Sequence, residues 1–150
     1  TLTKGTGVIN RIFHGYGKFE GEMDGRKNGA LISMSTGKAV AFAIFNLQAR
    51  GEMFVTHNDP VYEGMIVGLT PKPGDMIINV MKGKQLTNMR TQGTDENVVL
   101  TPVRQMSIAE QLSMLNTDEA LEITPKSLRL RKAILNPHDR KKSEKSGAAA

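Results

Sequence analysis

A polar segment near the middle of the chain, residues 82–96, sets the strongest limit on how this sequence can fold. It holds three cations, Lys82, Lys84 and Arg90, with almost no apolar residue and no acid before Asp95. Loops longer than about 12 residues in a compact domain are usually functional or disordered. We therefore expect a long, exposed, basic loop between two strand-like segments, suited to a polyanion, with a merely solvated surface loop as the alternative.

Short apolar runs separated by turn residues flank this segment, which indicates strands joined by turns. The strands are expected at 8–13, 30–33, 53–55, 64–67, 76–81, 97–100, 121–123 and 128–131. An apolar helix is expected over 39–50, ended by Gly51 and buried. The predicted fold class is therefore α+β, strand-dominated, with two or three short helices.

A further helix is expected to begin at Ser107, which has the spacing of a capping box to Glu110. Ile108, Leu112 and Leu115 recur on one face of that helix, as in an amphipathic helix. Beyond 142 the residues are mostly Ser, Lys, Gly and Ala, so we expect 143–150 to be a disordered tail.

Positive charge is concentrated near the C-terminus. Residues 126–145 carry eight Lys or Arg against two acids, which is +6, so the remainder of a chain of net charge +5 sums to −1. This asymmetry favours an anionic partner, nucleic acid first, although a solvated tail is a plain alternative. Within 128–131 the residues alternate, so Leu130 is expected in the core and Arg129 and Arg131 on the wet face, with Lys132 adjacent.

Catalytic and metal-binding chemistry find little support in the residues. The chain has no cysteine, and its histidines, His14, His57 and His138, lie far apart in the sequence. Gly5-Thr-Gly7 precedes a strand-like run instead of opening a helix, so it is not a phosphate loop. We expect no catalytic residue and no metal site. The absence of cysteine fits a cytoplasmic protein, and no apolar run approaches the length of about 18 residues of a membrane-spanning helix, so no membrane contact is expected.

Stretches that carry a family resemblance run through almost the whole chain. They are 5–10, 13–16, 26–29, 36–39, 45–47, 61–68, 82–84, 86–88, 93–96, 124–127 and 130–132. In this order they resemble the C-terminal end of the bacterial TypA/BipA translational GTPases, relatives of elongation factor G. Since the sequence also lacks an initiator methionine, it reads as a piece of such a protein.

The resemblance implies a domain division and a function. Residues 1–17 would be the last strand of a ferredoxin-like domain shared with elongation factor G, and 18–142 the C-terminal domain peculiar to this family. The family is a ribosome-associated GTPase implicated in stress adaptation and large-subunit assembly. Its C-terminal domain is expected to reach the peptidyl-transferase region with a loop, here 82–95, against ribosomal RNA and the acceptor end of transfer RNA.

These inferences lead to one functional hypothesis, a monomeric RNA-binding module. Its expected partners are the 50S subunit or 70S ribosome, 23S ribosomal RNA and transfer RNA. GTP and Mg²⁺ would belong to an N-terminal domain outside this sequence, so no cofactor is expected here. A protein-interaction module with a basic tail is the alternative. The expected RNA-binding residues are Lys82, Lys84, Gln85, Asn88, Arg90, Thr91, Arg129, Arg131, Lys132, Arg140 and Lys141.

Overall fold

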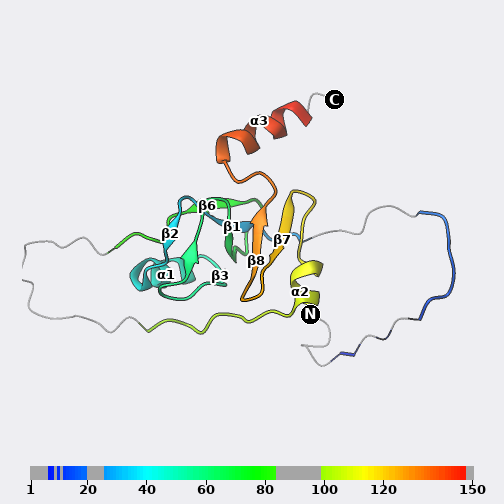
Figure 1. The fold of residues 1–150 in the computed structure, drawn as a ribbon, viewed down its shortest axis with the longest axis horizontal. Helices are drawn as coiled ribbons and strands as arrows, with labels where there is room; N and C mark the ends of the chain where they lie inside the picture. The colour runs from blue at the N-terminus through cyan, green and yellow to red at the C-terminus, as the bar shows by residue number, and fades with distance from the viewer. Residues whose placement is uncertain (1–6, 9, 11, 20–25, 84–98, 148–150) are drawn as a thin grey trace, which may run out of the picture.

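The structure, a computed structural model, describes residues 7, 8, 10, 12–19, 26–83 and 99–147 (Figure 1). It is an α+β fold rich in short strands, as the sequence predicts. In chain order the elements are β1 (Ala30–Ser33), β2 (Gly37–Lys38), α1 (Ala41–Gln48), β3 (Glu52–Met53), β4 (Pro60–Val61), β5 (Ile66–Leu69), β6 (Met76–Ile78), α2 (Ile108–Ser113), β7 (Glu119–Ile123), β8 (Leu128–Lys132) and α3 (Pro137–Gly147).

A four-stranded sheet in the order β3-β5-β1-β6 forms the centre of the molecule. β1 pairs antiparallel with β5 and parallel with β6, and the β1–β5 register shifts between Leu31 and Ile32. Every residue of β1 and β5 is buried. Strands that are apolar on both faces need cover on both sides.

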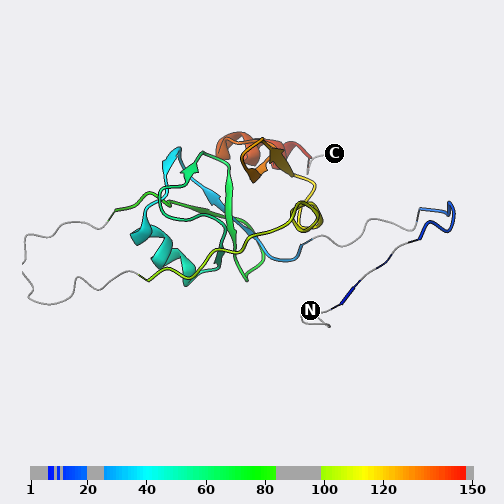
Figure 2. The same cartoon turned by 60° about the horizontal axis from the view of Figure 1, so that its bottom comes forward.

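The two sides of the sheet are covered by different elements. On one side, Leu31 and Val67 pack in a cluster with Ile44 of α1. On the other, Ile32 and Ile66 pack with Leu130 of β8. Figure 2 shows the sheet between α1 and the hairpin of β7 and β8. The hairpin is therefore the second layer of the core and is not a peripheral arm.

Helix α1 lies within the range predicted for it, but it is buried on one side only. Ala43, Ile44 and Leu47 are buried, whereas Phe45 is 48% exposed. The expectation of a buried helix is corrected in this respect, because the sheet covers a single face of α1.

Gly64 fixes the junction between the hairpin and the sheet. Its N–H donates to the carbonyl oxygen of Ser33 at 3.0 Å, and its own carbonyl accepts from the N–H of Lys132 at 2.9 Å. Its φ of 83° is one that L side chains rarely adopt, and a Cβ there would lie 2.7 Å from the Cα of Leu135. Glycine is thus required where β8 reaches the sheet.

Several predicted strands are shorter than expected or absent from the described residues. The ranges expected at 53–55, 64–67 and 76–81 correspond to β3, β5 and β6. Of the strand expected at 8–13, residues 8, 10, 12 and 13 are described and none of them is in a strand, while 9 and 11 lie outside the described residues. Of 97–100 only 99 and 100 are described, and neither is in a strand. The domain boundary at 17/18 stays a prediction.

Helix α2 confirms its predicted cap and corrects its predicted face. Ser107 Oγ accepts from the N–H of Glu110, whose carboxylate accepts from the N–H of Ser107 at 2.8 Å. Ile108 and Leu112, however, are 47% and 53% exposed, and the buried residue of this helix is Gln111. A helix of six residues is too short to bury a full apolar stripe, and the chain enters the core only before and after it, at Met106 and Leu115.

The expectation of a disordered tail over 143–150 is wrong for 143–147, which belong to α3; residues 148–150 lie outside the described part. The Asn136 side-chain oxygen accepts from the N–H of His138 at 2.8 Å, which caps the helix, and Pro137 suits its first position. α3 is polar throughout and extends away from the body (Figure 1).

Candidate nucleic-acid interface

The β7–β8 hairpin carries an oppositely charged pair on each of its faces. In its register, Glu122 lies opposite Arg129, and Glu119 lies opposite Lys132. Because side chains alternate along a strand, these two pairs point to opposite sides. We call the side of Glu122, Arg129 and Arg131 the outer face, and the side of Glu119, Leu130 and Lys132 the inner face.

On the outer face a tyrosine and an arginine share one carboxylate. The Tyr62 hydroxyl donates to Glu122 Oε2 at 2.6 Å, and Arg129 Nη1 lies 3.7 Å from Glu122 Oε1. Arg131 Nη1 donates to the carbonyl oxygen of Lys132 at 3.2 Å, which leaves its charge uncompensated by any carboxylate in the described residues. Glu122, Arg129 and Arg131 together therefore carry a net charge of +1.

Tyr62 stays a hydrogen-bond donor to the Glu122 carboxylate over a wide pH range. Burial, and then the hydrogen bond and negative charge of Glu122, raise the pKa of Tyr62 to about 12, against the partial opposition of the two arginines. At neutral pH the hydroxyl is thus a donor that holds Glu122 in place, and the outer face keeps its positive balance.

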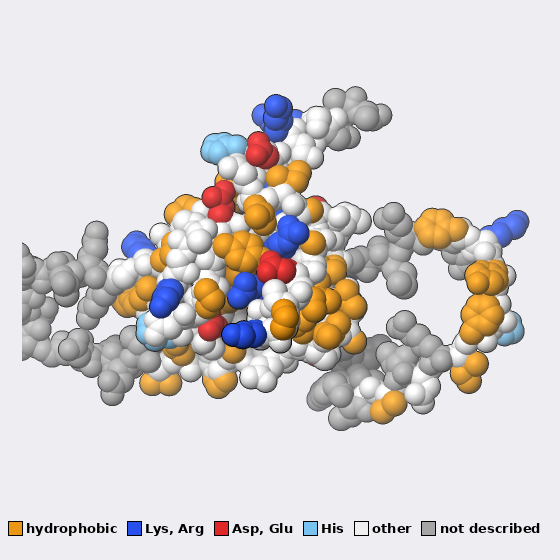
Figure 3. All heavy atoms as spheres, viewed as in Figure 1, with side chains coloured by type: hydrophobic (Ala, Val, Ile, Leu, Met, Phe, Trp, Pro, Cys, Tyr) orange, Lys and Arg blue, Asp and Glu red, His pale blue; other side chains and the backbone are white. Residues whose placement is uncertain are grey.

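Further cations lie around the hairpin. Figure 3 shows Lys and Arg side chains scattered over the side of the molecule on which β8 lies, with few acids between them. Lys126 is exposed in the turn between β7 and β8. In this turn the N–H of Ser127 donates to Thr124 Oγ1 at 3.0 Å, and the N–H of Thr124 donates to the carbonyl oxygen of Ser127 at 3.0 Å. Lys126 was not among the predicted residues, although Thr-Pro-Lys-Ser between two alternating runs signals a turn.

The inner face overturns the placement expected for Lys132. Lys132 is 1% exposed, and its ammonium group contacts the carboxylates of Asp75 at 2.5 Å, Asp118 at 2.7 Å and Glu119 at 3.0 Å. Position 132 has the same parity as Leu130 and therefore points inward. Lys132 is not on the surface, so it cannot belong to an RNA-contacting face.

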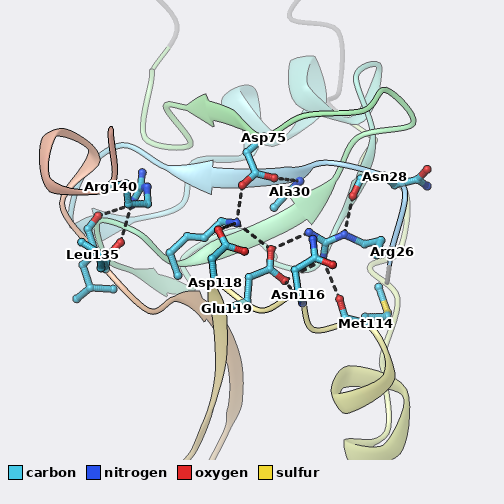
Figure 4. A network of polar contacts seen from close by, with 12 residues as sticks. Arg26, Asn28, Ala30, Asp75, Met114, Asn116, Asp118, Glu119, Leu135 and Arg140 are labelled. Atoms are coloured by element: carbon cyan, nitrogen blue, oxygen red, sulfur yellow. Dashed lines mark hydrogen bonds and ion pairs between the residues drawn. The ribbon is translucent and has the colours of Figure 1, made fainter. Parts of the chain in front are cut away.

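Figure 4 shows how the inner-face charges are joined to another part of the chain. Arg26 pairs with Glu119 at 2.7 Å and donates to the carbonyl oxygen of Met114 at 3.1 Å. Burial alone would lower the pKa of Lys132, but its hydrogen bonds to Asp118, Asp75 and Glu119 outweigh burial and raise it. We call Arg26, Asp75, Asp118, Glu119 and Lys132 the inner cluster. It connects the hairpin to the sheet, and its Arg26, Asp75 and Asp118 also line a hollow of about 450 Å³.

The other predicted RNA-binding residues are spread over the molecule. Lys82 is exposed after β6, and the predicted residues of the basic loop beyond it, Lys84, Gln85, Asn88, Arg90 and Thr91, lie outside the described residues. Arg140 is tied to the chain before α3, since its Nη1 donates to the carbonyl oxygens of Ile134 and Leu135, while Lys141 is exposed on α3. Of the predicted set, the structure brings together Arg129 and Arg131 on β8, and Arg140 and Lys141 on α3, which line one hollow.

The described residues also offer no basis for two other kinds of site. No helix there is long and apolar enough to cross a membrane. Nor does this part of the chain contain a group of three or more His, Cys, Asp or Glu side chains that could hold a metal ion.

The sequence places the chain in a family. Residues 28–137 match the TypA/BipA C-terminal domain, and the chain belongs to this family. It is 49% identical over 146 residues to the large ribosomal subunit assembly factor BipA of Buchnera aphidicola subsp. Schizaphis graminum, and 45% identical over 146 and 147 residues to the proteins of that name from Salmonella typhimurium and Escherichia coli K12. Each alignment covers 97% of this chain, which spans about a quarter (24%) of the length of those relatives.

Proposed function

We propose that this domain is the RNA-binding C-terminal module of a ribosome-associated GTPase that acts in assembly of the large subunit. The observation that carries the proposal is the outer face, on which Arg129 and Arg131 outnumber Glu122 and the exposed Lys126 lies in the adjoining turn. Phosphate attraction dominates nucleic-acid affinity, and few aromatic side chains are present to stack bases. The name borne by the relatives, large ribosomal subunit assembly factor, agrees with a ribosomal RNA target.

The finer parts of the proposal follow from the family resemblance. The 50S subunit or 70S ribosome, 23S ribosomal RNA and the acceptor end of transfer RNA are the proposed partners, and stress adaptation is the proposed context. GTP and Mg²⁺ would be bound and hydrolysed by another part of the parent protein. A calorimetric titration of residues 1–150 with GTP should accordingly give no saturable binding.

Co-sedimentation with purified subunits tests the proposal. The chain should pellet with 50S subunits more than with 30S subunits, and the double variant Arg129→Glu/Arg131→Glu should pellet less. The matched control is Arg50→Glu/Lys72→Glu, which makes the same change in net charge at exposed positions outside the hairpin. Equal loss of pelleting in both double variants would show that overall charge, and not the outer face, governs association.

A protein-interaction module is the second candidate, and the polar, basic helix α3, which extends from the body, favours it. An acidic protein partner would bind such a helix without RNA. RNase treatment before a pull-down separates the two functions, because ribosomal association should vanish under RNase only if RNA is the ligand.

A further inference from the structure

The hollow of about 450 Å³ beside the inner cluster lies between the central sheet and the start of α3. Three cations from two separate segments also line it: Lys27 from the chain before β1, and Arg140 and Lys141 from α3. Lys27 and Lys141 are exposed and Arg140 is partly exposed, so these cations form a rim that solvent reaches. The three residues that define the outer face do not line this hollow. A site here is therefore distinct from the one on the hairpin.

The backbone that carries Lys27 is anchored on both sides. Arg26, which precedes it, is paired within the inner cluster, and its side chain is 7% exposed. Gly29, two residues after Lys27, packs so closely that a Cβ there would lie 1.8 Å from the carbonyl oxygen of Gly74. Lys27 thus starts from a fixed point on the rim, and a ligand has to order only its side chain.

The start of α3 is anchored as well. Arg140 Nη1 donates to the carbonyl oxygens of Ile134 at 3.0 Å and Leu135 at 2.5 Å, which ties the first turn of the helix to the chain before it. Leu135 in turn lies against Gly64, at the junction of the hairpin with the sheet. Figure 4 shows Arg140 and Arg26 on opposite sides of the carboxylates of the inner cluster. Cations from both segments are thereby held around one hollow.

The acids in the hollow repel an anion only weakly, because they are already paired. Lys132 contacts Asp75 at 2.5 Å and Asp118 at 2.7 Å. The inner cluster, with two cations and three carboxylates, has a net charge of −1, and the three rim cations bring the total to +2. Since the excess positive charge lies on the rim, the hollow favours an anion at its mouth.

The lining of the hollow suits a phosphate better than the carboxylates of an acidic protein. Its apolar surface is small, because Ile32 is buried and Ile77 is 43% exposed, so the apolar side chains of a peptide would find little to pack against. The side chains of Asn28 and Asn116 line it too. Their amide groups are suited to hydrogen-bond a ribose 2′-hydroxyl next to a backbone phosphate.

We propose that this hollow binds one backbone phosphate of RNA, held between Lys27 of the body and Lys141 of α3, with Arg140 beside them. Charge-assisted hydrogen bonds from lysine and arginine to phosphate oxygens are among the strong ones. The inference rests on the proposed RNA-binding function and adds a second contact to that of the outer face. Because one phosphate contacts both segments, RNA binding fixes α3 against the body of the domain.

Titration with a single-stranded RNA of about eight nucleotides and hydroxyl ends tests this site, since one binding fold covers strands of about that length. Nuclear magnetic resonance of the backbone amides should show saturable shifts at Lys27, Asn28 and Lys141. The double variant Lys27→Ala/Lys141→Ala should bind about three- to tenfold more weakly, the usual worth of one hydrogen bond. Its slope of log affinity against log salt should fall by about 0.7, the value for one phosphate contact. Arg140 is left in place because it anchors α3.

A matched control separates contact from overall charge. Lys38→Ala/Lys142→Ala removes the same charge from one exposed residue of the body and from the exposed neighbour of Lys141, and neither residue lines the hollow. The control should keep the salt slope of the unaltered chain. All four lysines are exposed, so both double variants should keep the melting temperature within a few degrees. An unchanged slope in Lys27→Ala/Lys141→Ala, or an equal fall in the control, would overturn the site.

Two other anions identify the ligand. Inorganic phosphate and a glutamate peptide of the same length as the RNA should both bind more weakly than the RNA. Equal binding of inorganic phosphate at the same amides would make this a site for free phosphate, and equal binding of the peptide would make it a site for an acidic protein. Either result would overturn the proposal.

Failure of this site differs from failure of the proposed function. If the hollow variant keeps its slope while Arg129→Glu/Arg131→Glu still weakens pelleting with 50S subunits, RNA binding stands and the contact at α3 alone is wrong. If the unaltered chain binds neither the RNA nor 50S subunits, both are wrong.

Discussion

The two faces of the β7–β8 hairpin are built from the same strands and the same kind of charge, yet they have opposite roles. On the inner face the cation of Lys132 is buried among three carboxylates. On the outer face Arg129 pairs with the one carboxylate of Glu122, whereas Arg131 donates only to backbone carbonyl oxygens, and both arginines are partly exposed. The comparison teaches that strand parity, together with what lies across the strand, decides whether a basic residue stabilises the fold or is available to a ligand.

The largest expected effect is the loss of the inner cation. Lys132→Met should destabilise the protein by about 3 kcal/mol, because the buried Glu119 keeps only Arg26 and the partly buried Asp75 loses its cation, whereas the exposed Asp118 loses little. Arg131→Met, the matched change on the outer face, should cost less than about 1 kcal/mol. Urea denaturation of both variants measures the difference. Equal losses would mean that the two faces do not differ in the way the structure indicates.

The pH dependence of stability should also single out the inner cluster. Burial raises the pKa of Asp75, but hydrogen bonds from Lys132 and from the N–H of Ala30 outweigh it and hold that pKa below the ordinary 3.8. Its contribution is therefore fully present above pH 3.8 and is lost as the pH falls through the lower, folded-state pKa. The pKa of Lys132 is raised above 10.5, so its contribution is present below pH 10.5 and is lost as the pH rises through the higher value.

Thermal melts between pH 6 and pH 2 would show the acid part of this dependence. Asp75→Asn should lower the melting temperature at pH 6 and flatten its fall toward pH 2. If the melting temperature of Asp75→Asn falls toward pH 2 as steeply as that of the unaltered protein, the loss of stability in acid is due to other carboxylates. One example is that of Glu110, whose pKa is lowered by its hydrogen bonds to Ser107.

A smaller effect is expected on the outer face from Tyr62. Tyr62→Phe should cost about 1 kcal/mol, because Glu122 loses one hydrogen bond but stays within reach of water. In a Tyr16→Phe background Tyr62 is the one remaining tyrosine. Its absorbance titration should then give a pKa of about 12. That pKa should fall when Glu122→Gln removes the negative charge, but it should stay above 10 because burial, the larger cause, remains. A value near 10 before that change would contradict the shared carboxylate.

Local patterns in the sequence were enough to predict part of this fold. The alternation from Leu128 to Arg131 places Leu130 inside, and the capping box at Ser107 is formed. The cap of α3 is also a local feature, since the Asn136 side-chain oxygen accepts from the N–H of His138 and Pro137 stands at the first helical position. Such signals act between neighbours in the chain, so they survive without knowledge of the tertiary fold.

The remaining features depend on contacts between residues far apart in the sequence. The burial of Lys132 requires carboxylates at 75, 118 and 119 to converge, and no local pattern shows that. Similarly, the exposure of Ile108 and Leu112 depends on how the short α2 meets the core. Of the candidate site, the two outer arginines could be predicted, and the turn signal of Thr-Pro-Lys-Ser marks Lys126 as well. The contact of Tyr62 with Glu122 could not, because it joins residues 60 positions apart in the sequence.

The salt dependence of binding to 50S subunits tests the central claim most directly. If the outer face contacts phosphate, Arg129→Ala/Arg131→Ala should lower the slope of log affinity against log salt by about 1.4, or roughly 0.7 per contact for single strands. Arg50→Ala/Lys72→Ala should leave that slope unchanged, and neither double variant should move the melting temperature by more than a few degrees. An unchanged slope in the hairpin variant, or an equal fall in the control, would contradict the outer face as the RNA-binding surface.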